Sequence, residues 1–353
     1  MLHIALVGCG RISERHAELL GKGQVAHARL AAVCDVNIDK ARRLGERYGV
    51  PWYADMHELA ANEKRVDIIS ILTPSGLHAE HVIALAPYKK HLIVEKPMAL
   101  SLDDADAMIR ICDENGVKLF VIKQNRFNLP VRKLKEALIN KRFGKLVLGT
   151  IRVRWCRDQA YYDLDKWRGT WAFDGGVFAN QASHHIDLLE WMMGDVESVF
   201  AKSITALVDI ETEDTGMAVL KFRNGALGMI EATTATRPKD LEGSISILGE
   251  KGTVEIGGFA VNQMKTWNFI EKETDDAEML ASSSVNPPDV YGFGHKAYYE
   301  HVVDCILNNK KALIDGLEGR KSLELISAIY ESIETGREVF LRFKPQKCKL
   351  GMK

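Results

Sequence analysis

The sequence contains no run of about 20 consecutive apolar residues, the length that a helix needs to cross a membrane. The apolar stretch from Met1 to Gly8 is too short for a signal peptide, has no basic leader and continues directly into a glycine motif. These absences argue against export and against a membrane partner. We therefore expect a cytoplasmic protein.

The sequence also lacks paired cysteines and has almost no net charge. None of its six scattered cysteines forms a Cys-x-x-Cys pair, so the pattern supports neither a disulfide framework nor a zinc site, and we expect no metal. The 47 basic residues are nearly balanced by 48 acidic ones. Because no global field would attract nucleic acid, an anionic ligand would have to be bound by local arginines.

The chain is long enough for two domains, because 353 residues exceed the usual size of one compact core. In its first third, short apolar runs alternate with segments of helical spacing. Runs with the near-continuous hydrophobicity of strands covered on both faces lie at 4–7, 30–34, 68–72, 92–94 and 119–122. Helical spacing is found at 12–20, 39–48, 78–85 and 103–115. This alternation predicts a doubly wound α/β domain over residues 1–123.

The pattern changes in the second domain, which we predict for residues 124–353. Helical spacing predicts helices at 131–141, 184–193, 294–307 and 319–335. Strand-like runs lie at 145–156, 199–206, 216–222, 227–232, 243–248 and 253–256, and Asn224-Gly225 predicts a hairpin between two of them. The polar stretch 271–289 is expected to be a surface loop. We expect a mostly antiparallel open sheet, whose uncovered face would favour oligomerisation.

A glycine motif, Gly8-Cys9-Gly10-Arg11-Ile12-Ser13, lies between the first predicted strand and helix. Such a turn lets backbone amides and a helix N-terminus approach a pyrophosphate. Asp35 ends the next strand, where a carboxylate can bind ribose hydroxyls and would repel the extra phosphate of NADP. The pattern therefore predicts an NAD site. In the alternatives, the glycines only form a turn and Asp35 caps a helix, or Arg42 or Arg43 reaches a 2′-phosphate.

A charged pair, Glu95-Lys96, directly follows a buried strand. Ligands bind at the carboxyl ends of the strands in open α/β sheets. Burial and a positive nicotinamide ring would lower the pKa of Lys96. Lys96 could then accept or relay the proton of an alcohol as hydride leaves carbon. In the alternative, Lys96 is a surface lysine paired with Glu95.

The Glu95-Lys96-Pro97 motif, with segments 73–78 and 174–187, resembles the signature of the glucose-fructose oxidoreductase/inositol dehydrogenase (Gfo/Idh/MocA) family. The resemblance covers nearly the whole chain. It implies an N-terminal Rossmann domain, an α+β C-terminal domain with a large open sheet, a cis peptide before Pro97, and Lys96 at the junction of nicotinamide and substrate. Further cofactor contacts are implied for Thr73, Pro74, His78, Glu95, Gln124, Trp167 and Arg168.

The second-domain motif of the family often has an aspartate four residues before a histidine, and this chain has Asn180 and His184 at those places. One helical turn would put both side chains on the same face. Asparagine cannot take a proton at neutral pH, so we expect Asn180 to orient a substrate group. Lys96 and His184 remain as acid-base candidates with their roles open. His184 could instead be a structural core histidine, and Asp187 could orient it or bind backbone.

Several linked segments narrow the resemblance to the bacterial UDP-N-acetyl-2-amino-2-deoxyglucuronate dehydrogenases; they lie at 123–126, 161–162, 167–171, 180–184 and 291–295. This resemblance implies oxidation of the C3 hydroxyl of UDP-N-acetylglucosaminuronate in O-antigen and lipopolysaccharide biosynthesis. It also implies a homotetramer and, in some enzymes, recycling of NADH by 2-oxoglutarate. Arg126, Arg157 and Arg168 would bind the pyrophosphate and carboxylate, and Tyr161 would contact a ring.

Two other functions fit the same residues. One is a different sugar or cyclitol dehydrogenase, or a nucleotide-sugar ketoreductase, because substrate preference depends on second-domain loops. The other is a regulator that binds NAD without catalysis. The presence of both Lys96 and His184 argues against the regulator.

Overall fold

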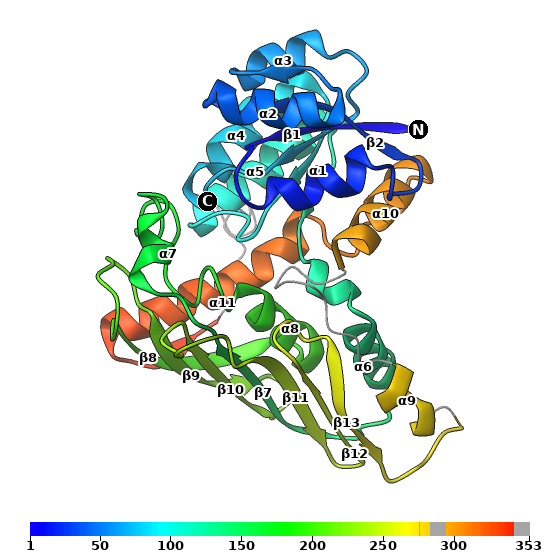
Figure 1. Cartoon of the computed structure of the whole chain (residues 1–353). Helices are drawn as coiled ribbons and strands as arrows, with labels where there is room; N and C mark the ends of the chain where they lie inside the picture. The colour runs from blue at the N-terminus through cyan, green and yellow to red at the C-terminus, as the bar shows by residue number, and fades with distance from the viewer. Residues whose placement is uncertain (275, 283–293, 342–353) are drawn as a thin grey trace, which may run out of the picture.

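The structure, a computed structural model, describes residues 1–274, 276–282 and 294–341. Two sheets lie one above the other, with the N-terminal half, blue and cyan, over the large sheet, green and yellow (Figure 1). Helices α8 (Ser183–Met193) and α11 (Gly316–Thr335) lie between them. In the described part of the chain, no helix is long and apolar enough to cross a membrane.

The first sheet is wholly parallel and has the order β3-β2-β1-β4-β5-β6, the order of a Rossmann fold. Its strands are β1 (Leu2–Val7), β2 (Ala28–Cys34), β3 (Trp52–Tyr53), β4 (Ile68–Ile71), β5 (His91–Val94) and β6 (Leu119–Val121). Its helices are α1 (Ser13–Gly21), α2 (Ile38–Tyr48), α3 (Met56–Asn62), α4 (His78–Leu85) and α5 (Leu102–Asn115). The predicted α/β architecture is confirmed, although the short β3 and α3 were not predicted.

Local sequence signals set the ends of these helices. Ser101 caps α5 by accepting a hydrogen bond from the backbone N–H of Asp104, and Asn37 caps α2 in the same way. Both helices end at a glycine in the left-handed conformation, Gly116 for α5 and Gly49 for α2. The N-caps therefore fix where the loops at the carboxyl edge of the sheet end, and the C-cap glycines fix where the loops at the opposite edge begin.

The second sheet has eight strands in the order β13-β12-β11-β7-β10-β9-β8-β14. Among the strands described, β7 and β10 pair in parallel and the other neighbours are antiparallel, as predicted. The hairpin at Asn224-Gly225 joins β9 to β10 and is confirmed. The strands are β7 (Leu146–Arg154), β8 (Val196–Ile204), β9 (Thr215–Phe222), β10 (Leu227–Thr233), β11 (Glu242–Gly249), β12 (Gly252–Gly257), β13 (Gln263–Phe269) and β14 (Val339–Phe340).

One face of this sheet is covered and the other is not. α8 and α11 pack with the inward-facing side chains in a second core that is separate from that of the first sheet. Alternate residues of β8 to β10 point the other way, and large apolar side chains are exposed there: Phe200, Ile204, Met217, Val219 and Leu227. The open sheet with an apolar outer face matches the sequence expectation.

The remaining helices are α6 (Leu129–Ile139), α7 (Gln159–Asp163), α9 (Asp276–Ser282) and α10 (Gly294–Leu307). α9 corrects the prediction of a loop over 271–289, of which 275 and 283–289 lie outside the described residues. Tertiary contacts hold α9, because Asp276 accepts hydrogen bonds from Arg142 and from the indole of Trp267. The side chains of α10, including Tyr299 and Val302, belong to the core of the first sheet, so packing crosses the domain division predicted at residue 123.

Gly76 lies at a close contact between the two halves, and its replacement tests this packing. Its N–H donates a hydrogen bond to the carbonyl of Phe173, and an added Cβ would lie 2.1 Å from the carbonyl oxygen of Ala172. Because the clash is with backbone, we expect Gly76→Ala to lower the free energy of unfolding by about 1–3 kcal/mol in urea titrations. Gly10→Ala is the control, since its added methyl group meets nothing within 4 Å. Equal unfolding midpoints for the two variants would contradict the contact.

Candidate active site

A cavity of about 740 Å³ lies between the two halves, at the carboxyl ends of β1, β2, β4 and β5. The first domain supplies one wall through the loops that follow these strands, and the second domain supplies the other through the segment that follows β7, which includes α7, and through the start of α8. Sixteen of the residues predicted as site residues line this cavity: Gly8, Gly10, Arg11, Ile12, Asp35, Thr73, Pro74, Glu95, Lys96, Gln124, Arg157, Tyr161, Trp167, Arg168, Asn180 and His184.

Two predicted site residues, His78 and Arg126, do not line it. The ring nitrogens of His78 contact the carbonyl oxygens of Pro97 and Thr73 at 2.8 and 2.9 Å, so His78 joins the loops behind the cavity wall. Arg126 is 3% exposed and donates to both carboxylate oxygens of Asp187, at 2.8 Å each, and to Glu318 at 3.0 Å. A buried guanidinium needs such partners. The expectation that Arg126 binds substrate is therefore corrected.

The glycine loop leaves open space where a pyrophosphate would bind. Gly8 has a φ of 103°, and a Cβ there would lie 2.7 Å from the backbone of Leu72, so glycine is required. Gly10 lines the cavity and has nothing within 4 Å of an added Cβ. Ser13, which stands in the place of a third glycine, donates its hydroxyl to the carbonyl of Gly10 at 2.6 Å and starts α1. Backbone amides and a helix N-terminus therefore face the cavity together.

Asp35 directly follows β2, and it lines the cavity. It accepts hydrogen bonds from the backbone N–H of Cys9 at 2.7 Å and of Asn37 at 2.8 Å. A carboxylate has further lone pairs, which remain for ribose hydroxyls. Asn37, rather than Asp35, caps α2, which removes the helix-cap alternative. The basic residue on this part of the wall is Lys40, because neither Arg42 nor Arg43 lines the cavity.

Lys96 extends from the end of β5 to the second domain. Its amine donates hydrogen bonds to the backbone oxygen and to the side-chain oxygen of Asn180, each at 2.9 Å. Burial lowers the pKa of Lys96, and the carboxylates of Glu95 and Asp174 partly oppose that shift. The alternative of a surface lysine paired with Glu95 is therefore wrong. The cis peptide between Lys96 and Pro97 is confirmed.

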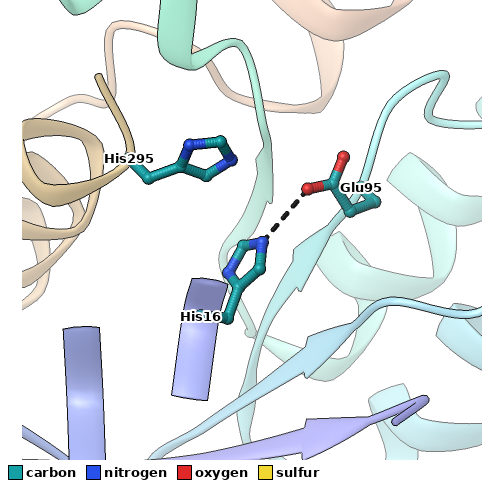
Figure 2. A group of neighbouring side chains, drawn as sticks. All are labelled: His16, Glu95 and His295. Carbon is teal, nitrogen blue, oxygen red and sulfur yellow. Dashed lines mark hydrogen bonds and ion pairs between the residues drawn. The ribbon is translucent and has the colours of Figure 1, made fainter. Parts of the chain in front are cut away.

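Glu95 pairs instead with His16, as Figure 2 shows, and His16 does not line the cavity. Its Oε1 lies 3.2 Å from Nε2 of His16, and its Oε2 accepts from the backbone N–H of Lys96. Burial raises the pKa of Glu95, but the hydrogen bond and charge of His16 outweigh it and bring that pKa to about 2. With His295, these residues form a group whose donor atoms lie within 4.8 Å of one another, close enough for a metal. The hydrogen bond between His16 and Glu95 already occupies two of those donors.

His184 faces the same cavity as Lys96. α8 begins at Ser183, so Asn180 lies in the turn before the helix and not one turn along it, yet both side chains still line the cavity. Burial, followed by the positive charges of Lys96 and Lys123, holds the pKa of His184 well below its usual value, so its ring is neutral. The side-chain nitrogen of Gln124 lies 3.1 Å from Nε2 of His184. Because an amide nitrogen only donates, Nε2 accepts and the ring proton is on Nδ1.

Two buried polar atoms at this position have no hydrogen-bond partner among the described residues, namely Nδ1 of His184 and Oε1 of Gln124. Buried polar groups are rarely left unpaired, so these atoms suit a polar ligand. Asp187 does not orient His184, because it is paired with Arg126 and Lys123. His185 is fully buried against Trp155 and does not line the cavity.

Arginines and aromatic rings form the second-domain wall. The guanidinium of Arg168 lies 4.6 Å from the ring centres of both Tyr161 and Trp167 and donates to the Tyr161 hydroxyl at 2.8 Å. Arg157 lies 5.3 Å from the Tyr161 ring centre and pairs with Asp240 at 2.9 Å. Trp155 also lines the cavity. It was not predicted, because one tryptophan in a strand-like run is typical of a core residue.

Comparisons with known proteins agree with this geometry. Models of the oxidoreductase family match nearly the whole chain, with the NAD-binding Rossmann fold at residues 2–123 and the C-terminal alpha/beta domain at residues 135–341. The myo-inositol 2-dehydrogenase of Thermotoga maritima is 33% identical over 96% of this chain and 98% of its own length.

Two solved structures are closer in sequence than that enzyme. The WlbA dehydrogenase of Bordetella pertussis, in complex with NADH and UDP-GlcNAcA, is 41% identical, with a TM-score of 0.89 over 97% of this chain and 99% of the other. The WlbA dehydrogenase of Chromobacterium violaceum, in complex with the same two ligands, is 43% identical, with a TM-score of 0.90 over 98% and 97% of the two chains. The cofactor of the N-terminal domain is NAD, and the open glycine loop, Asp35 and the unpaired polar atoms fit it.

Gly10→Ala separates cofactor binding from folding. The added methyl group meets no protein atom but would occupy space that the pyrophosphate needs, so folding should be unchanged. We expect the Kd for NAD, measured by calorimetry, to rise about tenfold or more, the equivalent of ~1.4 kcal/mol. NAD binding equal to that of the unaltered protein would show that Gly10 does not face the pyrophosphate.

Proposed function

The chain belongs to the Gfo/Idh/MocA oxidoreductase family, and from that premise we propose that it oxidises the C3 hydroxyl of UDP-N-acetylglucosaminuronate to a ketone with NAD. One observation carries the proposal: Lys96, His184 and the wall of arginines and aromatic rings all line the same cavity. The likeness to two dehydrogenases whose structures contain UDP-GlcNAcA supports the choice of substrate.

Lys96 is the base in the proposed reaction. A neutral amine has two N–H groups and one lone pair, and the two Asn180 oxygens accept from the two N–H groups. The lone pair is then left to accept the hydroxyl proton, and the lowered pKa increases the fraction of the amine that is neutral. NAD, when bound, supplies the acceptor for the hydride that leaves C3.

His184 has a different role, which its tautomer determines. Its ring is neutral and holds a proton on Nδ1, so it donates a hydrogen bond to the substrate oxygen and does not remove its proton. That hydrogen bond strengthens as negative charge develops on the oxygen during hydride loss. Gln124 keeps the ring in this tautomer.

Arg157 and Arg168 bind the anionic groups of the substrate. Guanidinium groups suit the bidentate recognition of carboxylate and pyrophosphate. Both are already held in place, Arg157 by Asp240 and Arg168 by Asp165 and Tyr161, so little conformational freedom is lost on binding. Tyr161 and Trp167 provide flat apolar surfaces for the sugar and uracil rings.

We also propose a pathway, a means of NADH recycling and an oligomeric state for the enzyme. A cytoplasmic enzyme of O-antigen and lipopolysaccharide biosynthesis would make the 3-keto sugar for a following step. Recycling of NADH by 2-oxoglutarate would draw this uphill oxidation forward. The exposed apolar face of β8 to β10 would be covered by other copies of the chain in a homotetramer.

A second candidate is a cyclitol dehydrogenase, which the 33% identity to a myo-inositol 2-dehydrogenase favours. Inositol has neither carboxylate nor pyrophosphate, so it would leave Arg157 and Arg168 without a ligand.

A substrate comparison separates the two functions. We expect NADH formation to have its highest kcat/KM with UDP-N-acetylglucosaminuronate, a lower value with UDP-N-acetylglucosamine and almost none with myo-inositol. Equal or better turnover of inositol would overturn the proposal.

Arg157→Ala tests how the substrate is recognised. A hydrogen bond to a charged group contributes about 1.5–3 kcal/mol, so we expect KM for the uronate to rise about 10- to 100-fold with a much smaller change in kcat. Arg154→Ala is the matched control, because Arg154 pairs with Glu231 on the sheet and does not line the cavity. Equal effects of the two substitutions would exclude a specific role for Arg157.

Lys96→Met tests whether Lys96 is the base. Comparison with the unaltered protein also tests the regulator alternative, because a regulator would show no turnover in either protein. We expect turnover to fall about 10²- to 10⁴-fold while NAD still binds. In the unaltered enzyme, kcat/KM should rise with pH as the amine loses its proton, with a midpoint below 10.5 because burial lowers the pKa of Lys96. A variant that retains turnover, or a profile that falls over the same range, would exclude Lys96 as the base.

A further inference from the structure

Asp174 lies behind Asn180, on the side away from Lys96, and is 1% exposed. Its Oδ1 accepts a hydrogen bond from the side-chain nitrogen of Asn180 at 2.5 Å, and its Oδ2 accepts from the backbone N–H of Gly169 at 2.8 Å. Asn180 in turn presents its side-chain oxygen to the amine of Lys96. The three side chains form one chain of hydrogen bonds, from a buried carboxylate through an amide to an amine.

The chemistry of the two ends determines how the amide in the middle must point. An ionised carboxylate only accepts hydrogen bonds, and a lysine N–H only donates them. Asn180 has one acceptor oxygen and one donor nitrogen, so its nitrogen must face Asp174 and its oxygen must face Lys96. A reversed amide would set oxygen against oxygen at one end and N–H against N–H at the other.

We propose that Asp174 is a positioning residue for Lys96: through the side-chain amide of Asn180, it holds an acceptor oxygen against the lysine amine and directs the lone pair of that amine toward the substrate. This inference rests on the proposed function in taking Lys96 as the base. Asp174 also places a buried negative charge near the amine, which already faces Glu95, Lys123 and Arg168. That charge raises the pKa of Lys96 against the effect of burial.

A purely structural role for Asp174 must be distinguished from this one. Its bond to Gly169 could simply hold the turn over residues 169–174. Asp174→Asn is informative because the new side-chain oxygen can still accept from Gly169, while the new nitrogen faces Asn180. Asn180 must then reverse, which puts its own N–H against the Lys96 amine.

The expected result for Asp174→Asn is a fall in kcat of about 10- to 100-fold with little change in KM, because the base is misdirected although the arginines still bind substrate. The pKa of Lys96 should fall as well. It is measured without substrate, by competitive labelling with acetic anhydride across a pH series and mass spectrometry of the Lys96 peptide.

The double variant Asp174→Asn with Asn180→Asp provides the matched rescue. The carboxylate now contacts Lys96 directly, and the amide at 174 donates to it, so the polarity of the chain is restored. We expect kcat to return part of the way to its original value. The labelling midpoint should rise above its original value, because a carboxylate now lies against the amine in place of a neutral amide oxygen. A merely structural Asp174 predicts no rescue, since Asn180→Asp changes nothing at Gly169.

Asn180→Ala keeps the test decisive if Asp174→Asn folds poorly. It leaves the bond between Asp174 and Gly169 intact and removes only the bridge, so it should reproduce the lower kcat and the lower midpoint. An unchanged labelling midpoint in Asp174→Asn or in Asn180→Ala would overturn the inference. Absence of turnover with the UDP-sugar in the unaltered protein would overturn the proposed substrate, while the labelling series would still decide the role of Asp174.

Discussion

The hydrogen bonds from the Lys96 amine to the two oxygens of Asn180 are the contact on which the site depends. Lys96 lies at the end of a strand in the first sheet, and Asn180 lies in the turn before α8 over the second sheet. The two residues are 84 positions apart, so only the packing of one half on the other brings them together. The glycine loop of the first domain and the arginines of the second domain therefore line the same cavity, which also contains Lys96 and Asn180.

Buried charged groups in this protein have two kinds of partner. Structural groups are paired with an opposite charge, whereas Lys96 is hydrogen-bonded to neutral groups. Glu95 is bonded to His16, and Asp187 is bonded to Arg126 and Lys123, so the pKa of each carboxyl group is lowered and both stay ionised. Lys96 is different, because its hydrogen-bond acceptors are the neutral oxygens of Asn180. Burial lowers the pKa of such an amine, so it loses its proton more readily than an exposed lysine, as a base in an alcohol oxidation must. His184 is kept neutral by burial and by the same lysine.

The sequence predicted the parts of the site that depend on local spacing. The glycine loop, Asp35 and Lys96 each follow a buried strand, and the carboxyl ends of parallel strands meet at one edge. The short β3 and α3 were missed, because two strand residues and two helical turns leave little periodicity. α9 was missed because distant partners, Arg142 and Trp267, hold it.

The errors within the site have a similar cause. Arg126 has the residue type of an anion ligand, but Asp187 and Glu318, 61 and 192 positions away, occupy its guanidinium. Asp174 stood inside a recognised motif, yet its contact with Asn180 depends on the fold of the turn between them. Trp155 showed no signal that distinguishes a cavity wall from a core. Partners remote in sequence therefore decided which polar residues were available to a ligand.

A crystal structure with NAD and UDP-N-acetylglucosaminuronate bound tests the central claim most directly. The account predicts the Lys96 amine and the His184 ring within about 3.2 Å of the C3 hydroxyl, with the nicotinamide on the opposite side of that carbon. A complex in which Lys96 and His184 lie on separate surfaces, or in which another carbon of the sugar faces the nicotinamide, would contradict it.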